Sequence, residues 1–201
     1  MNVKNALEQR FGLNEQIRLN DVEVEPSSIH AIMINEIVPE DPEQDFYGSS
    51  GEQYLSTTIP LFQKAGLQVE DIGDILQLGV YITNAVKMPK SGYAVEKTSM
   101  EESLPYLEEE IALFPNVRVI VLMGDVAKKM FNRIARKTAK RNPIPSGATY
   151  KLRATPFYFG DTRVIPSYIM TGGNLLIEKS KVAMVMEDIA TMAQIIKADA
   201  D

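Results

Sequence analysis

Residues 29 to 51 read IHAIMINEIVPEDPEQDFYGSSG, a short apolar run followed directly by a polar loop. The run from Ile29 to Ile34 is typical of a parallel strand that is buried on both faces. In open α/β sheets, ligands bind in the loops that follow the carboxyl ends of such strands. The acidic residues of this loop are therefore candidates for a functional site, although an acidic surface loop would have the same composition. They are Glu36, Glu40, Asp41, Glu43 and Asp45.

Helical and strand patterns alternate along the rest of the chain. Apolar spacing predicts helices over residues 52–65, 99–115 and 125–140 and around 182–196, with a capping box at Ser99 to Glu102 starting the second. Strands are predicted at 79–83 and 117–123, and a hairpin around Gly160 and Asp161 within residues 149–168. This alternation predicts an α/β fold, a three-layer αβα sandwich with a central, mainly parallel four-stranded sheet.

The length and composition are sufficient for one ordinary domain. The chain has 201 residues and 45% hydrophobic content, so we expect a single domain over residues 1–201, with residues 1–28 as a peripheral amino-terminal arm. The amino terminus lacks the apolar core of a signal peptide, and the longest apolar runs are too short to span a bilayer. We therefore expect a cytoplasmic monomer that does not associate with membranes.

The chain has no cysteine, and His30 is its only histidine. The absence of cysteine excludes disulfides, thiolate catalysis and any cysteine-ligated zinc or iron-sulfur site. A single histidine argues against a histidine-rich metal site. We expect neither a metal ion nor a cofactor.

The charge is unevenly distributed. The formal net charge is -6, yet residues 126–160 contain basic residues and no acidic ones. The basic residues there are Lys128, Lys129, Arg133, Arg136, Lys137, Lys140, Arg141, Lys151 and Arg153. Most of them lie on the predicted outer face of the 125–140 helix, which suits a phosphate backbone, although most such faces are only solvated.

Two side chains at predicted strand ends and one in the polar loop are suited to chemistry or recognition. Glu36 could hold or activate a water molecule, or be a solvated loop acid. Asn84 offers a donor and an acceptor that match the edge of a nucleobase or an amide, or it caps its own loop. Phe46 could stack on a planar ligand, or fill the core. The turn at residues 171–174, TGGN, precedes a predicted helix and leaves open a small-molecule enzyme with a phosphate cradle.

Four segments together resemble the uracil-DNA glycosylase superfamily, in order from about Ile29 to Ile196. NEIVPEDPEQDFYGSSG (35–51) resembles the family's first motif, in which a G-E-x-P-G turn leads to P-F-x-G. VYITNAVK (80–87) resembles V-Y-I-T-N-x-V-K and is the most specific match. VIVLMGDVA (119–127) resembles the central strand and following helix, and VIPSYIM (164–170) takes the place of the H-P-S motif. The pattern is nearest to the iron-sulfur branch of many thermophiles.

The resemblance implies roles for particular residues, because in this family a flipped uracil enters a pocket at the sheet edge and water replaces it. Glu36 would be the motif carboxylate, with Asn35 beside it in the catalytic motif. Phe46 would stack on the base, Asn84 would read its edge, and Gly48 would belong to the same pocket. Ser167 would contact phosphate, and Ile169 or Met170 would wedge into the vacated stack. The DNA-contacting set also includes Lys87, Lys128 and Arg136.

The sequence departs from the family at three points. The iron-sulfur cysteines are absent, Asn35 replaces a glycine, and Ile165 stands where the family has a histidine that stabilises the departing uracil. Loss of one such donor typically costs ~2.7 to 4 kcal/mol, or about 10² to 10³ in rate. The prediction is a base-excision glycosylase that hydrolyses the N-glycosidic bond of uracil or another deaminated base in DNA. The alternative is a catalytically silent module that binds a nucleobase, nucleotide or nucleic acid.

Overall fold

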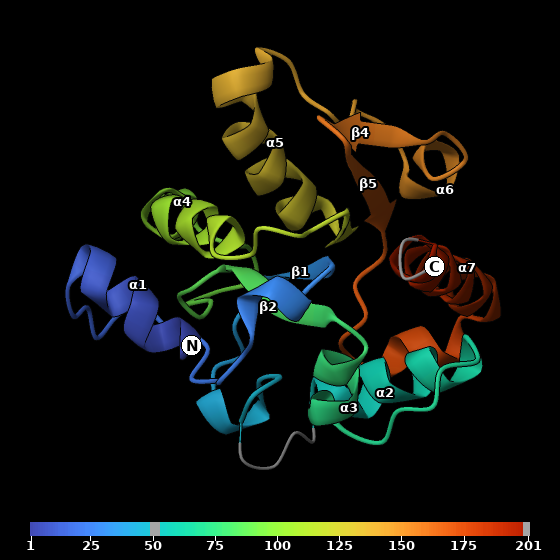
Figure 1. Cartoon of the computed structure of the whole chain (residues 1–201), viewed down its shortest axis with the longest axis horizontal. Coiled ribbons are helices and arrows are strands. Elements are labelled where there is room, and N and C mark those ends of the chain that lie inside the picture. The colour runs from blue at the N-terminus through green and yellow to red at the C-terminus, as the bar shows by residue number, and fades with distance from the viewer. Residues whose placement is uncertain (49–52, 199–201) are drawn as a thin grey trace.

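The computed structural model describes residues 1–48 and 53–198 and has a five-stranded sheet at its centre (Figure 1). The strand order is β2-β1-β3-β5-β4. Four strands are parallel, and β4 at one edge runs antiparallel to β5. The strands are β1 (Ala31–Ile37), β2 (Val80–Val86), β3 (Val119–Met123), β4 (Phe157–Phe159) and β5 (Thr162–Ser167).

The parallel strands form because their apolar runs are covered on both faces. Every residue of β2 and β3 is buried, and successive residues point to opposite sides of the sheet. Ile32 and Ile34 of β1 belong to one hydrophobic cluster, whereas Met33 belongs to the other. The two clusters are the two halves of the core.

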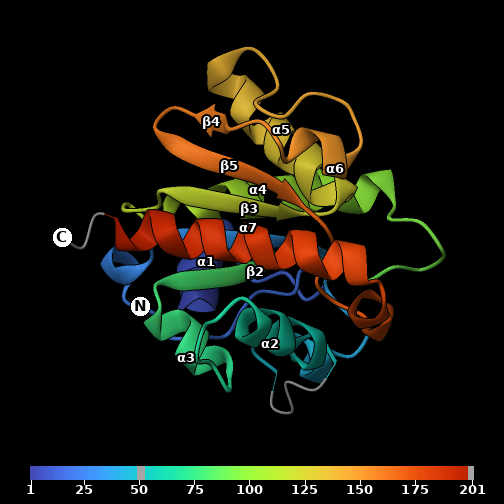
Figure 2. The same cartoon turned by 90° about the vertical axis from the view of Figure 1, so that its right-hand side faces the viewer.

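Helices cover each face of the sheet. One face carries α1 (Val3–Phe11), α4 (Lys97–Ala112) and α5 (Asp125–Ala139). The other carries α2 (Leu55–Lys64), α3 (Ile72–Gln77) and α7 (Lys179–Lys197), and α7 crosses in front of the strands in Figure 2. The remaining short elements are α6 (Thr149–Leu152) and the 3-10 helices η1 (Pro26–Ser28), η2 (Pro42–Gln44) and η3 (Gly173–Ile177).

The predicted fold class, a three-layer α/β sandwich with a mainly parallel sheet, is confirmed. The sheet has five strands instead of four because the predicted hairpin around Gly160 adds its first arm, β4, to the edge. Gly160 has φ 60°, a left-handed conformation that a hairpin turn readily uses.

Two local predictions need correction. The capping box at Ser99 is wrong, because α4 already begins at Lys97 and the side chain of Ser99 is buried. Helix α3 was not predicted, since its six residues are too few to show a helical period. Its signal is Asp71, whose side chain accepts the N–H of Asp74. The predicted start of the first core helix, Glu52, lies outside the described residues.

The described part of the chain contains no helix with both the length and the apolar character needed to cross a membrane.

Candidate functional site

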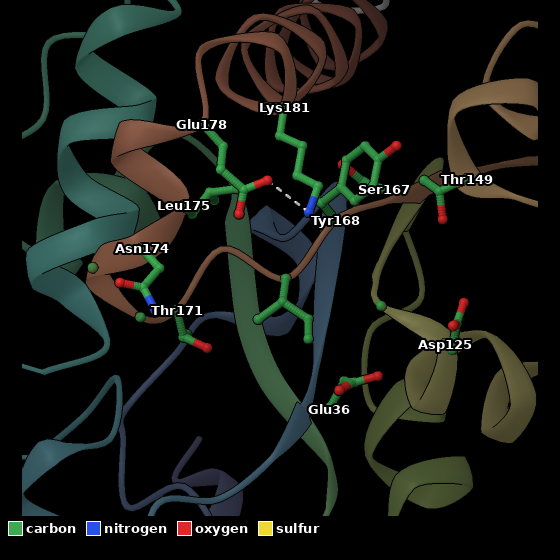
Figure 3. Close-up of a pocket in the computed structure, with 14 residues that line it drawn as sticks. Glu36, Asp125, Thr149, Ser167, Tyr168, Thr171, Asn174, Leu175, Glu178 and Lys181 are labelled. Carbon is green, nitrogen blue, oxygen red and sulfur yellow. Dashed lines mark ion pairs between the residues drawn. The ribbon is translucent and has the colours of Figure 1, made fainter.

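A cleft of ≈ 560 Å³ lies at the carboxyl ends of three parallel strands (Figure 3). Glu36 near the end of β1, Gly124 directly after β3 and Ser167 at the end of β5 all line it. This is the sheet edge at which the sequence predicted a site. Its other lining residues are Asp125, Thr149, Tyr168, Ile169, Thr171, Gly172, Gly173, Asn174, Leu175, Glu178 and Lys181.

Glu36 is fixed at the wall of this cleft by the first turn of α5. Its Oε2 accepts a hydrogen bond from the backbone N–H of Val126 at 2.7 Å. Burial raises the pKa of Glu36 above its ordinary value, although the N–H of Val126 opposes this shift. A carboxylate with a raised pKa accepts a proton more readily, so Glu36 is suited to hold and deprotonate a water molecule.

Gly124 makes this arrangement possible, a role that the sequence did not reveal. Its φ is 100°, which favours glycine, and a Cβ there would lie 2.6 Å from Oε2 of Glu36 and 2.8 Å from Cγ1 of Ile169. The recognisable signal was a glycine between a buried strand and a helix. Gly124 therefore allows Glu36 to reach the amino end of α5.

Ser167 is held by a buried ionic network that was also not predicted. Its Oγ donates to Oδ2 of Asp188 at 2.7 Å, and Asp188 pairs with Arg153 at 3.0 Å. Burial raises the pKa of Asp188, against the opposing effect of Ser167 and Arg153. Because the single hydroxyl hydrogen of Ser167 is used by Asp188, the predicted phosphate contact would require this hydroxyl to rotate.

The lining of the cleft is more acidic than basic. Among the described lining residues, Glu36, Asp125 and Glu178 are acidic and Lys181 is basic. Lys181 pairs with Glu178 at 2.8 Å and lies over the ring of Tyr168 (Figure 3). This balance suits an uncharged base inside the cleft better than a phosphate group.

The predicted base reader, Asn84, lies away from the cleft in a polar cluster with Asn35 and Asp45. Asn84 is 1% exposed and stands opposite Asn35 in the pairing of β2 with β1. Nδ2 of Asn35 donates to Oδ1 of Asn84 at 2.8 Å, and Nδ2 of Asn84 donates to both carboxylate oxygens of Asp45, at 2.8 and 3.0 Å. We call these three residues the asparagine cluster. Within this cluster, both the carbonyl oxygen and the amino group of the Asn84 side chain are hydrogen-bonded.

The asparagine cluster is energetically unfavourable in two respects. Within the described residues, Oδ1 of Asn35 is buried and has no hydrogen-bond partner. An unpaired buried polar group typically costs about 1–3 kcal/mol. Asp45 is largely buried as well, and burial raises its pKa despite the hydrogen bond from Asn84. A buried polar atom without a partner, such as Oδ1 of Asn35, calls for an explanation, for example a catalytic role or a bound water or ion.

The predicted stacking residue, Phe46, is a core residue in this structure. Its side chain is 0% exposed, and its ring packs against Tyr54 with the centroids 5.2 Å apart. Gly48 is required by the loop itself, because a Cβ there would lie 2.2 Å from the carbonyl oxygen of Glu43. With Asp45, Gly48 lines a second cavity of ≈ 550 Å³, which is separate from the Glu36 cleft.

The predicted wedge residues and the predicted DNA-contacting residues differ in their exposure to solvent. Ile169 is 38% exposed at the cleft, whereas Met170 is fully buried in the core and is not available as a wedge. The side chain of Lys87 does not lie on the surface in this structure, because its ammonium is buried and pairs with Glu110, and its contact with DNA stays a prediction.

The two predicted basic contacts on α5 also differ. Lys128 is mostly buried, with its Nζ 2.8 Å from Asp125, whereas Arg136 is exposed. Ile165, at the position of the motif histidine, is buried in the hydrophobic core.

The fold and the site define an α/β protein with a partly desolvated carboxylate in a cleft at the carboxyl edge of its sheet. A family model described as the uracil DNA glycosylase superfamily matches residues 36–178, which is more than half of the chain. The chain belongs to this superfamily. No curated protein matches it. Because there is no cysteine, the chain does not fit the iron-sulfur cluster found in one branch of the family.

Proposed function

We propose that this protein is a DNA glycosylase that hydrolyses the N-glycosidic bond of uracil or another deaminated base. Family membership supports a glycosylase-like function. The observation that carries the finer proposal is Glu36, whose carboxylate is partly desolvated, lines the cleft and is held by Val126. Its place at the sheet edge is where the chemistry of an open α/β fold is expected.

Glu36 would act on the attacking water. As the oxygen of this water bonds to the sugar carbon, the carboxylate accepts one of its protons. The bond between that carbon and the base nitrogen breaks, and its electron pair leaves with the base, which is then protonated from solvent. Because Ile165 supplies no charged or polar group to the departing base, we expect slow turnover.

DNA would bind along α5, next to the acidic cleft. Three exposed basic residues of this helix and the residue that caps its carboxyl end follow one another at intervals of four, three and four, and we call them the basic stripe: Lys129, Arg133, Arg136 and Lys140. In the described part of the chain, none of them has an acidic partner. The stripe spans about 16 Å at a rise of ~1.5 Å per residue. Phosphates would contact the stripe while the flipped base enters beside Ile169.

Base release under single-turnover conditions tests this proposal. Wild-type protein in excess over a uracil-containing oligonucleotide, single- or double-stranded, should generate abasic product. Glu36→Gln keeps an acceptor for the Val126 N–H but cannot accept a proton, so product formation should slow by about 10² to 10⁴. Glu40→Gln, which removes an exposed carboxylate from the same loop, is the control. Absence of product from the wild type at high excess would contradict the proposal.

A catalytically silent binding module is the second candidate. Ile165 favours it, because the buried isoleucine at this position gives the departing base no group that stabilises its charge. It predicts that uracil-containing DNA stabilises the protein without forming product. A protein with no affinity for bases, nucleotides or DNA would exclude it.

A further inference from the structure

Two exposed tyrosines lie beside the Glu36 cleft, and the proposed mechanism uses neither of them. Tyr150 is 56% exposed and Tyr93 is fully exposed. Packing in the core therefore does not explain either ring. An aromatic ring whose face is open to water can stack on another flat group.

Tyr150 lies at the rim of the cleft on a fixed element. It follows Thr149, which lines the cleft, in the short helix α6 (Figure 3). Leu152 of the same helix is buried, and Arg153 directly after it pairs with Asp188 of α7 at 3.0 Å. These contacts hold α6 against the body of the protein, so Tyr150 is kept next to the opening of the cleft.

Tyr93 lies at the same edge of the sheet, in the segment between β2 and α4. This segment protrudes at the end of the sheet where α6 also lies (Figure 2). Burial raises the pKa of Glu36, and the positive charge of Lys90 in this segment is among the influences that oppose the rise, so the segment lies close to the cleft. Aromatic rings from two separate segments are thus available near the opening.

The charge around both tyrosines favours a polyanion. Nζ of Lys151 lies 5.6 Å from the centroid of the Tyr150 ring. Residues 126–160 contain no acidic residue, and residues 88–95 contain Lys90 and no acidic residue. Proteins bind single-stranded nucleic acid with aromatic rings next to basic side chains, because the rings stack on bases and the cations contact phosphates. A duplex keeps its bases stacked on one another and does not offer their faces.

We propose that Tyr93 and Tyr150 stack on unpaired bases that flank the base in the Glu36 cleft, and that the substrate is single-stranded DNA. This inference rests on the proposed function and names its substrate class. In a single strand, a base enters the cleft without the loss of a base pair, which lowers the cost of extruding it. The basic stripe would contact the phosphates of the same strand.

Equilibrium binding of oligothymidylate tests the inference without requiring turnover. A single strand of about 12 nucleotides falls within the usual site size for such surfaces, and it contains no uracil. The wild type should bind it more tightly than a duplex of the same length at the same salt concentration. Tyr150→Ala and Tyr93→Ala should each lower the affinity about 5- to 150-fold, the range for the loss of one base–aromatic stack.

Three controls separate stacking from other causes. Tyr158→Ala removes a tyrosine with the same exposure, 56%, that also lies next to a cation, Arg163. Because β4 pairs Tyr158 with Arg163 near the start of β5, this ring lies away from the carboxyl edge, and the affinity should not change. Tyr150→Phe keeps the ring and should keep the affinity. An abasic strand of the same length, which has phosphates and no bases, should bind the wild type and Tyr150→Ala equally.

The outcomes separate this inference from the proposed hydrolysis. If Tyr93→Ala or Tyr150→Ala binds oligothymidylate as tightly as the wild type, or if the duplex binds at least as tightly as the single strand, the inference is overturned, even if the wild type releases uracil from DNA. Equal losses of Tyr150→Ala for the abasic strand and for oligothymidylate would also overturn it, because the ring would then not act through the bases. If the wild type forms no abasic product but both alanine variants lose affinity for oligothymidylate and not for the abasic strand, the stacking sites stand and the proposed hydrolysis fails.

Discussion

At the scale of single residues, Glu36 sets the expected pH dependence. Its pKa in the folded protein is above the ordinary value because of burial, so the proton-accepting form is lost when the pH falls through this raised pKa. Single-turnover base release should therefore decline toward acid at a higher pH than an ordinary glutamate would give. Rates of Glu36→Gln, reduced by about 10² to 10⁴, should show no such titration. An unchanged acid limb in this variant would assign the titration to another group.

The contribution of Glu36 to stability should fall as the pH rises, whereas its contribution to base release should grow. A carboxyl whose pKa is raised on folding stabilises the fold fully below its unfolded-state pKa and loses this contribution as the pH rises through the folded-state pKa. Glu36→Gln removes this titration. Urea unfolding from pH 4 to pH 8, compared between wild type and Glu36→Gln, should therefore show the variant gaining relative stability as the pH rises.

Gly124 should tolerate no side chain. Alanine at this position would be strained at φ 100° and would place its Cβ against Glu36 and Ile169. We expect Gly124→Ala to lower the free energy of unfolding by about 1–3 kcal/mol and to displace the Glu36 carboxylate. Gly172→Ala also has a positive φ but has open space around its Cβ, so this control separates backbone strain from the clash.

At the scale of elements, the ionic network between α6, α7 and β5 supports one wall of the cleft. Arg153 follows α6, Asp188 belongs to α7, and Ser167 ends β5. Arg153→Ala would leave the buried Asp188 without its cation, and removal of one partner from such a pair costs about 3–5 kcal/mol. Urea unfolding should show this loss. Arg141→Ala, on an exposed position, should change stability by less than ~0.5 kcal/mol.

The helices and strands could be predicted where the apolar runs are long. The parts of the site that depend on residues far apart in the sequence could not be predicted. The runs around Ile32 and Val121 indicated the buried strands, and Glu36 was found because it lies just beyond the first apolar run, near the end of β1. The contact of Asp45 with Asn84 joins residues 39 positions apart and depends on how the loop folds back. No local sequence pattern indicates this contact. The burial of Lys87 likewise follows from Glu110 on α4, which the strand motif does not contain.

At the scale of the whole molecule, the basic stripe predicts a salt-dependent association with DNA. Four phosphate contacts correspond to a slope of about -3.6 in log affinity against log salt for duplex DNA and about -2.8 for single strands. Replacement of Lys129, Arg133, Arg136 and Lys140 by alanine should remove this contribution. The matched control replaces four exposed basic residues elsewhere, Arg10, Lys64, Lys97 and Lys197, and should keep most of the slope. Equal loss in both variants would indicate a general charge effect.

The separation of positive charge on α5 from negative charge in the cleft has a kinetic consequence. The search for DNA and the reaction on the base would take place on surfaces of opposite sign, so salt would act on the first process and not on the second. Added salt should lower the rate at which the protein finds its substrate, while the rate of base release from saturated complexes stays nearly constant. A protein with a net charge of -6 would thus combine overall repulsion from nucleic acid with local attraction along a single helix.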